Sequence, residues 1–144
     1  MPPTRRDPAT PVGRTRDTGF QIGVRRTLDL PAEDAWKLLT SPEGAETWLG
    51  RGDGIDLAPG TAYRLADGSH GEVRVFVPGS HLRATRQPGD WPRPSTVQVR
   101  VLPKGERSVV AFHEEHLPGA PEREERREHY SAALDALERL AGEW

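Results

Sequence analysis

The sequence predicts an α+β domain in which a curved antiparallel sheet of about six or seven strands wraps around one long C-terminal helix. Three observations lead to this fold class. A first strand is followed by two short helical segments, a series of short strands is separated by tight turns, and the last segment has helical periodicity. The chain has 144 residues, which is the size of one domain.

The C-terminal helix is predicted from about residue 121 to residue 142. Its apolar positions recur at the i, i+3, i+4, i+7 spacing of a single buried face, and they are Tyr130, Ala133, Leu134, Leu137, Leu140 and Ala141. A charged, Val-rich strand over residues 107–115 precedes it. A sheet that covers such a helix can enclose a ligand cavity between the two layers, and this points to a small-molecule binding module.

The first strand is predicted over residues 20–30. Its alternation places Arg26 on the same face as the apolar residues, so either the strand bulges near Gly23 or Arg26 points inward. An inward Arg26 needs a carboxylate partner, and Glu72 and Glu114 are the candidates. Two short helices then begin at Pro31 and, with Ser41 as the cap, at Pro42.

The middle of the chain has the pattern of a meander of short strands. Asp67-Gly68 predicts a tight hairpin, because both residues tolerate positive φ. Strict alternation places Val73, Val75 and Val77 on one face and Phe76 on the other. The predicted strands cover residues 55–57, 61–65, 70–77, 81–86 and 96–102.

Composition excludes several functions. A formal net charge of −2 argues against a dedicated nucleic-acid binder. The absence of cysteine excludes disulfides, thiolate catalysis and cysteine metal sites. No apolar run is long enough for a transmembrane segment and no secretory signal is visible, so a cytoplasmic location is expected. Residues 1–18 are expected to form a flexible N-terminal arm, with the domain over residues 19–144.

Several segments together resemble one superfamily. They are Thr18–Thr27, Pro31–Trp36, Ser41–Gly44, Trp48–Gly50, Asp67–Gly68, Gly71–Arg74, Trp91–Val99 and Phe112–Leu117, followed by Arg123, Arg126 and Tyr130. The chain resembles the SRPBCC superfamily, also called START-like or helix-grip. Within it, the chain is similar to the bacterial branch named for the C-terminal domain of the activator of heat-shock-protein-90 ATPase. The resemblance implies a sheet that grips the terminal helix around a cavity, which in many members holds a hydrophobic or aromatic molecule.

The candidate ligand site follows from this expected cavity. Arg26 and His113 are predicted to supply its polarity. Its apolar surface is predicted to come from Trp48, Tyr63, Phe76, Phe112, Tyr130 and Leu134. No cofactor and no metal is predicted. His113 and His116 lie three apart on a strand and so point to opposite faces.

The leading functional prediction is binding of a small hydrophobic, aromatic or lipid-like molecule. Two alternatives stay open. An enzyme similar to polyketide cyclases or hydrolases would use His113 with Glu114 or Tyr130 as a loose acid–base pair. A stress-related protein-interaction module would use Trp91 and the prolines around it. The expected partner is a small hydrophobic molecule and not nucleic acid, and a homodimer is left open.

Overall fold

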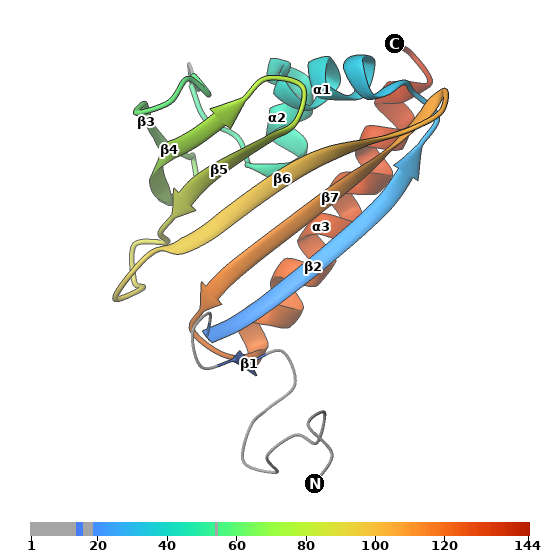
Figure 1. Cartoon of the computed structure of the whole chain (residues 1–144). Coiled ribbons are helices and arrows are strands. Elements are labelled where there is room, and N and C mark those ends of the chain that lie inside the picture. The colour runs from blue at the N-terminus through green and yellow to red at the C-terminus, as the bar shows by residue number, and fades with distance from the viewer. Residues whose placement is uncertain (1–13, 16–18, 54) are drawn as a thin grey trace, which may run out of the picture.

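The computed structural model describes residues 14–15, 19–53 and 55–144 of the chain. It confirms the predicted α+β fold, in which one face of an antiparallel sheet carries the long helix α3 (Figure 1). The helix pair α1–α2 lies on the same face, at the end of the sheet where α3 ends. Most of the predicted N-terminal arm lies outside the described residues. Arg14–Thr15, which were assigned to that arm, form a short strand instead.

The structure contains seven described strands and three described helices. The strands are β1 (Arg14–Thr15), β2 (Gly19–Leu28), β3 (Ala62–Arg64), β4 (His70–Val77), β5 (His81–Arg86), β6 (Ser95–Lys104) and β7 (Arg107–Leu117). The helices are α1 (Ala32–Thr40), α2 (Pro42–Trp48) and α3 (Ala120–Ala141). The predicted strand at Ile55–Leu57 is wrong. Its backbone is irregular, and the Asp56 carboxylate accepts a hydrogen bond from the Ala58 amide.

The strands are arranged in the order β1-β2-β7-β6-β5-β4-β3, and every neighbouring pair is antiparallel. The long strands β2 and β7, from the two ends of the domain, therefore lie side by side. Where they pair, the register shifts between Phe20 and Ile22, opposite the end of β7. There His116 has a φ of 65°, the left-handed conformation that a bulge uses.

A second bulge, in β4, changes which side chains face the helices. Val73 pairs with Ala84 and Phe76 pairs with Leu82, and both partners are buried core residues. The register shifts between Val73 and Val75, so Val73 and Phe76 share the helix-bearing face. The prediction that strict alternation separates Val73 from Phe76 is therefore wrong, because a bulge adds one residue to the strand.

Helix α2 begins at Pro42 as predicted, and α1 begins at Ala32, one residue after the predicted Pro31. The Ser41 hydroxyl accepts a hydrogen bond from the Gly44 amide at 3.1 Å, and Pro42 occupies the first turn of α2. Gly44 also allows α2 to approach α1 closely, because a Cβ at this position would lie 1.7 Å from the Leu38 carbonyl oxygen. This tight corner holds α1 and α2 against the end of the sheet.

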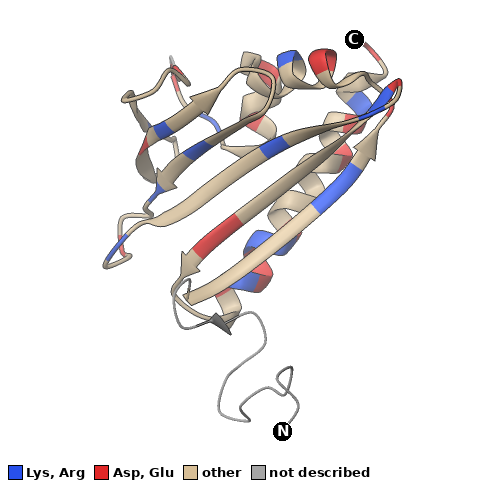
Figure 2. Ribbon diagram, in the orientation of Figure 1, with Lys and Arg blue, Asp and Glu red and all other residues tan. Residues whose placement is uncertain are grey.

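One hydrophobic core fills the space between the sheet and the three helices. Helix α3 contributes Tyr130, Ala133, Leu134 and Leu137 to it, while its first half carries a dense series of charges (Figure 2). That mixed character identifies α3 as amphipathic. Within the described residues, none of the helices combines the length and the apolar character needed to cross a membrane.

Candidate functional site

Three aromatic rings fill the layer between α3 and the sheet. Phe112 of β7 stacks on Tyr130 of α3 with ring centroids 5.0 Å apart, and the ring centroid of Trp48 in α2 lies 6.1 Å from that of Phe112. The three side chains are at most 1% exposed, and the Trp48 indole N–H donates to the Leu39 carbonyl oxygen at 3.0 Å. The cavity expected at this position is therefore occupied by packed side chains.

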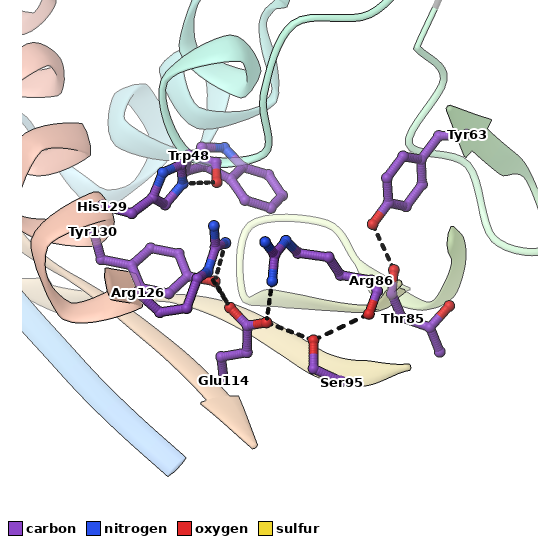
Figure 3. A network of polar contacts seen from close by, with 9 residues as sticks. All are labelled: Trp48, Tyr63, Thr85, Arg86, Ser95, Glu114, Arg126, His129 and Tyr130. Carbon is purple, nitrogen blue, oxygen red and sulfur yellow. Dashed lines mark hydrogen bonds and ion pairs between the residues drawn. The ribbon is translucent and has the colours of Figure 1, made fainter. Parts of the chain in front are cut away.

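A network of polar side chains surrounds Glu114, which is fully buried beside this aromatic layer (Figure 3). One carboxylate oxygen accepts from Arg126 Nε at 2.7 Å and from the Tyr130 hydroxyl at 2.7 Å. The other accepts from Arg86 Nη1 at 3.1 Å and from the Ser95 hydroxyl at 2.5 Å. Two arginines, from β5 and α3, thus meet one carboxylate from β7 in the interior.

This environment determines the charge state of the network. Burial raises the pKa of Glu114, but Arg126, Arg86 and the hydroxyls of Ser95 and Tyr130 outweigh it, so its pKa lies below the usual value. Burial raises the pKa of the Tyr130 hydroxyl, and the adjacent Glu114 charge raises it further. The carboxylate is therefore ionised and the phenol is protonated at neutral pH.

Two further polar groups border the network. Burial lowers the pKa of His129, and the charges of Arg126 and Arg86 lower it further, so the ring is neutral at pH 7. Its Nε2–H donates to the Trp48 carbonyl oxygen at 2.8 Å. The Tyr63 hydroxyl donates to the Thr85 carbonyl oxygen at 2.5 Å. The Tyr63 hydroxyl lies close to Gly71. A Cβ at Gly71 would lie 2.7 Å from this hydroxyl and 1.9 Å from the Thr85 carbonyl oxygen, so only glycine fits there.

A cleft of about 800 Å³ opens beside the α1–α2 corner. We call it the α1–α2 cleft. Its walls come from the end of α1, from α2, from the irregular segment that follows α2, and from Phe76 of β4. The lining residues are Thr40, Ser41, Pro42, Ala45, Glu46, Gly50, Gly52, Ile55, Asp56, Leu57, Ala58, Pro59 and Phe76. Apolar side chains form most of this surface, and the cleft has the size of a typical ligand site.

Of the eight residues predicted to bind a ligand, only Phe76 lines the α1–α2 cleft. Five of the others lie in the packed core, and they are Trp48, Tyr63, Phe112, Tyr130 and Leu134. The rings of Trp48, Phe112 and Tyr130 do lie together, as predicted, but they pack on one another. The predicted grouping of aromatic residues is therefore present without an open space at its centre.

The remaining two predicted residues lie elsewhere. His113 points to the face of the sheet opposite α3, where its Nε2 lies 2.9 Å from the Gln21 side-chain oxygen. The expectation that it lies in the cavity is wrong, because Phe112 takes the inward position and neighbours on a strand alternate. Arg26 reaches the edge of α3, where it contacts Asp135 at 2.5 Å and Glu138 at 2.7 Å. Neither expected partner of Arg26, Glu72 or Glu114, binds it.

Three residues of the buried network were not predicted as site residues: Arg86, Ser95 and Arg126. Periodicity could have found each of them. Arg126 lies one turn before Tyr130 on the buried face of α3, and Arg86 follows Leu82 and Ala84 at the spacing of one strand face. Ser95 precedes Val97, Val99 and Val101 in the same way. Trp91, predicted as a partner contact, packs its ring 5.0 Å from the Arg86 guanidinium.

Solved structures with this arrangement come from several organisms. CalU16 from Micromonospora echinospora is 21% identical, with a TM-score of 0.74 over 84% of this chain and 75% of that one. An HSP90 activator from Plasmodium falciparum is 17% identical, with a TM-score of 0.71 over 85% of this chain and 96% of that one. A START superfamily protein from Mycobacterium smegmatis is 13% identical, with a TM-score of 0.65 over 85% and 97% of the two chains. These similarities establish a common fold.

The sequence itself identifies the family. A search among curated proteins finds no match. The profile of the family described as activator of Hsp90 ATPase homolog 1-like protein matches residues 29–142, which include both helices of the α1–α2 corner and all of α3. This confirms the resemblance seen in the sequence segments, and the chain belongs to the family of activator of Hsp90 ATPase homolog 1-like proteins.

Proposed function

We propose that the protein reversibly binds a small, largely apolar molecule with an aromatic ring in the α1–α2 cleft. The observation that carries this proposal is the cleft itself: about 800 Å³ of space with Phe76 in its wall. Small-molecule sites in proteins have volumes of roughly 300–1,000 Å³ and mostly apolar linings. The sequence placed the ligand beneath α3, and the proposal moves it to the neighbouring corner of the same sheet face.

The preference for an aromatic ring is supported by the packing of Phe76. Its ring contacts Trp36 of α1 edge to face, with centroids 5.6 Å apart and an interplanar angle of 65°. Phe76 is half-buried, whereas Trp36 behind it is 7% exposed. A planar ligand can therefore extend the pair with a third ring, in the offset or edge-to-face arrangements that aromatic groups prefer.

Binding is favoured over catalysis by the polar groups available in the cleft wall. The ionisable residues there are Glu46 and Asp56, and both are exposed. Glu46 lies 3.3 Å from Arg51, and Asp56 accepts a backbone hydrogen bond. The acid–base pair expected of His113 with Glu114 is separated by the sheet, because the two side chains lie on opposite faces. General acid–base catalysis needs a positioned, desolvated pair, so we assign the cleft a carrier or sensor role.

The test begins with ligand-observed NMR of the full chain against a library of aromatic and lipid-like compounds. The dissociation constant of each hit is then measured for the wild type and for Phe76→Ala. Removing a ring contact worth about 1.5–3 kcal/mol should raise Kd by roughly tenfold or more. Ala58→Trp, a substitution at an exposed position of the cleft wall, should block the same ligand without touching the core.

The matched control is Val77→Ala. Val77 is the next residue on β4 and is 41% exposed, and it pairs with His81 on the other face of the sheet. Its substitution should leave Kd unchanged. Hits that bind Phe76→Ala and Ala58→Trp as tightly as the wild type would refute the proposed site.

A further inference from the structure

The buried network around Glu114 contains more hydrogen-bond donors than acceptors. A guanidinium group carries five N–H donors, so Arg86 and Arg126 bring ten. Three of their nitrogens donate to described residues: Arg86 Nη1 and Arg126 Nε to Glu114, and Arg126 Nη2 to the Tyr130 hydroxyl. Both arginine residues are 5% exposed. Most of their N–H groups therefore have no protein acceptor within the part of the chain that the structure describes.

The carboxylate of Glu114 cannot accept further hydrogen bonds from these N–H groups. Each of its two oxygens already accepts two hydrogen bonds, and a carboxylate offers about four such positions. The neighbouring side chains of His129 and Tyr63 act as hydrogen-bond donors to backbone carbonyl groups. His129 donates to the Trp48 carbonyl oxygen, and Tyr63 donates to the Thr85 carbonyl oxygen. The network thus holds two cations and one anion, an excess of one positive charge.

The unpaired nitrogens are not sealed by the surrounding side chains. Among the described residues, every buried side-chain nitrogen or oxygen that is sealed from solvent has a hydrogen-bond partner. Arg86 Nε and Nη2 and Arg126 Nη1 have no such partner, so each of these atoms keeps some accessible surface. An aromatic ring packs against each guanidinium, Trp91 against Arg86 at 5.0 Å and Tyr130 against Arg126 at 4.8 Å. The N–H edges carry the unpaired donors, and Figure 3 shows the two groups side by side next to Glu114.

We propose that the N–H edges of Arg86 and Arg126 form a binding site for a small carboxylate. A planar carboxylate matches the forked donors of a guanidinium, and one negative charge cancels the excess charge of the network. The gain is large in this position because a buried charge without a partner is costly. This site is separate from the α1–α2 cleft and does not depend on the ligand proposed there.

The test uses the full-length protein with sodium acetate as the probe. Acetate is titrated against sodium chloride at constant ionic strength near pH 7. The melting temperature and the ¹H–¹⁵N cross-peaks of the arginine Nε–H groups are followed. Acetate should raise the melting temperature in a saturable manner and shift the Arg86 Nε–H resonance, whereas chloride should do so far less.

Two variants separate this site from a general salt effect. Arg86→Met leaves one cation paired with one anion, so the response to acetate should disappear. Arg83→Met, on the same strand, removes an exposed arginine that contacts Gln98 on the opposite face, and it should respond like the wild type. Glu114→Gln leaves two buried cations without their carboxylate, so its melting temperature should rise more with acetate than that of the wild type.

Equal responses to acetate and chloride in the wild type would overturn the proposal. So would an Arg86 Nε–H resonance that does not move, a measurement that requires no variant to fold. An acetate response that persists in Arg86→Met would show that the ion binds elsewhere.

Discussion

The helix-bearing face of the sheet has two contrasting regions, the polar network around Glu114 and the mostly apolar α1–α2 cleft. Beneath the first half of α3, Glu114 is fully buried and holds Arg86 and Arg126 from two other elements. Beside α1 and α2, the cleft wall is partly irregular backbone and mostly apolar side chains. A buried charge network fixes its surroundings, because moving one member leaves the others unpaired. Open space for an apolar ligand therefore lies at the α1–α2 corner, whereas packed aromatic rings fill the layer beneath α3.

The largest effect is expected for Glu114→Gln. It leaves two guanidiniums buried without an opposing charge, so the free energy of unfolding should fall by about 3–5 kcal/mol. The control is Glu115→Gln, whose side chain is partly exposed and lies 4.0 Å from His116, and which should cost less than about 1 kcal/mol. Urea denaturation measures both. Equal small losses would mean that the network does not hold this part of the fold.

The second largest difference is expected between two phenylalanine substitutions, one in the aromatic layer beneath α3 and one in the α1–α2 cleft. Phe112→Ala opens a hole in the packed aromatic layer and should lower the free energy of unfolding by about 3–5 kcal/mol. Phe76→Ala should cost clearly less, because Phe76 is half-buried and already borders open space. Thermal or urea unfolding of the two variants checks this order. A Phe76→Ala loss as large as that of Phe112→Ala would place Phe76 in a closed core.

The third effect is the dependence of stability on pH. The folded pKa of Glu114 is lowered, so the folded state binds fewer protons at this residue than the unfolded state does. Ionised Glu114 therefore makes its full contribution to the free energy of unfolding above the pKa of the unfolded state, about 4.3. This contribution is lost as the pH falls through the lower pKa of the folded state. Urea unfolding below pH 5 should show a steeper loss for the wild type than for Glu114→Gln. Parallel curves would contradict this.

The smallest effect is expected for Arg26→Gln. Arg26 forms two ion pairs, but its partners Asp135 and Glu138 are about half exposed, so water and salt screen them. The free energy of unfolding should fall by at most about 1 kcal/mol, and less in 1 M salt. A loss comparable to that of Glu114→Gln, measured in the same buffer, would show that the edge of α3 is not solvated.

The fold could be predicted from the sequence because periodicity and turn chemistry are local. Helix α3 was predicted within one residue at each end, and β4 and β5 were predicted with their observed bounds. The hairpin turn predicted at Asp67-Gly68 is present, but only Gly68 has a positive φ, of 91°, and Asp67 does not. Each of these features depends on residues close together in the chain.

The site could be predicted only in part, for two physical reasons. Because side chains alternate along a strand, either Phe112 or His113 can face α3, but not both. Glu114 then lies on the same face as Phe112. Applying that rule would have placed the charged network correctly. The bulge in β4 and the irregular segment after α2 have no periodic signature, so the cleft that they border could not be placed from the sequence.

We expect an apolar ligand to enter the α1–α2 cleft while the aromatic layer beneath α3 stays closed. Methyl ¹H–¹³C spectra of the full chain, recorded during titration with a hit from the aromatic library, test it most directly. Binding in the cleft should cause saturable shifts at Ala45, Ile55 and Leu57, with Leu134 and Leu137 unchanged. Shifts that concentrate at Leu134 and Leu137 would contradict it, because the ligand would then lie between the sheet and the C-terminal helix.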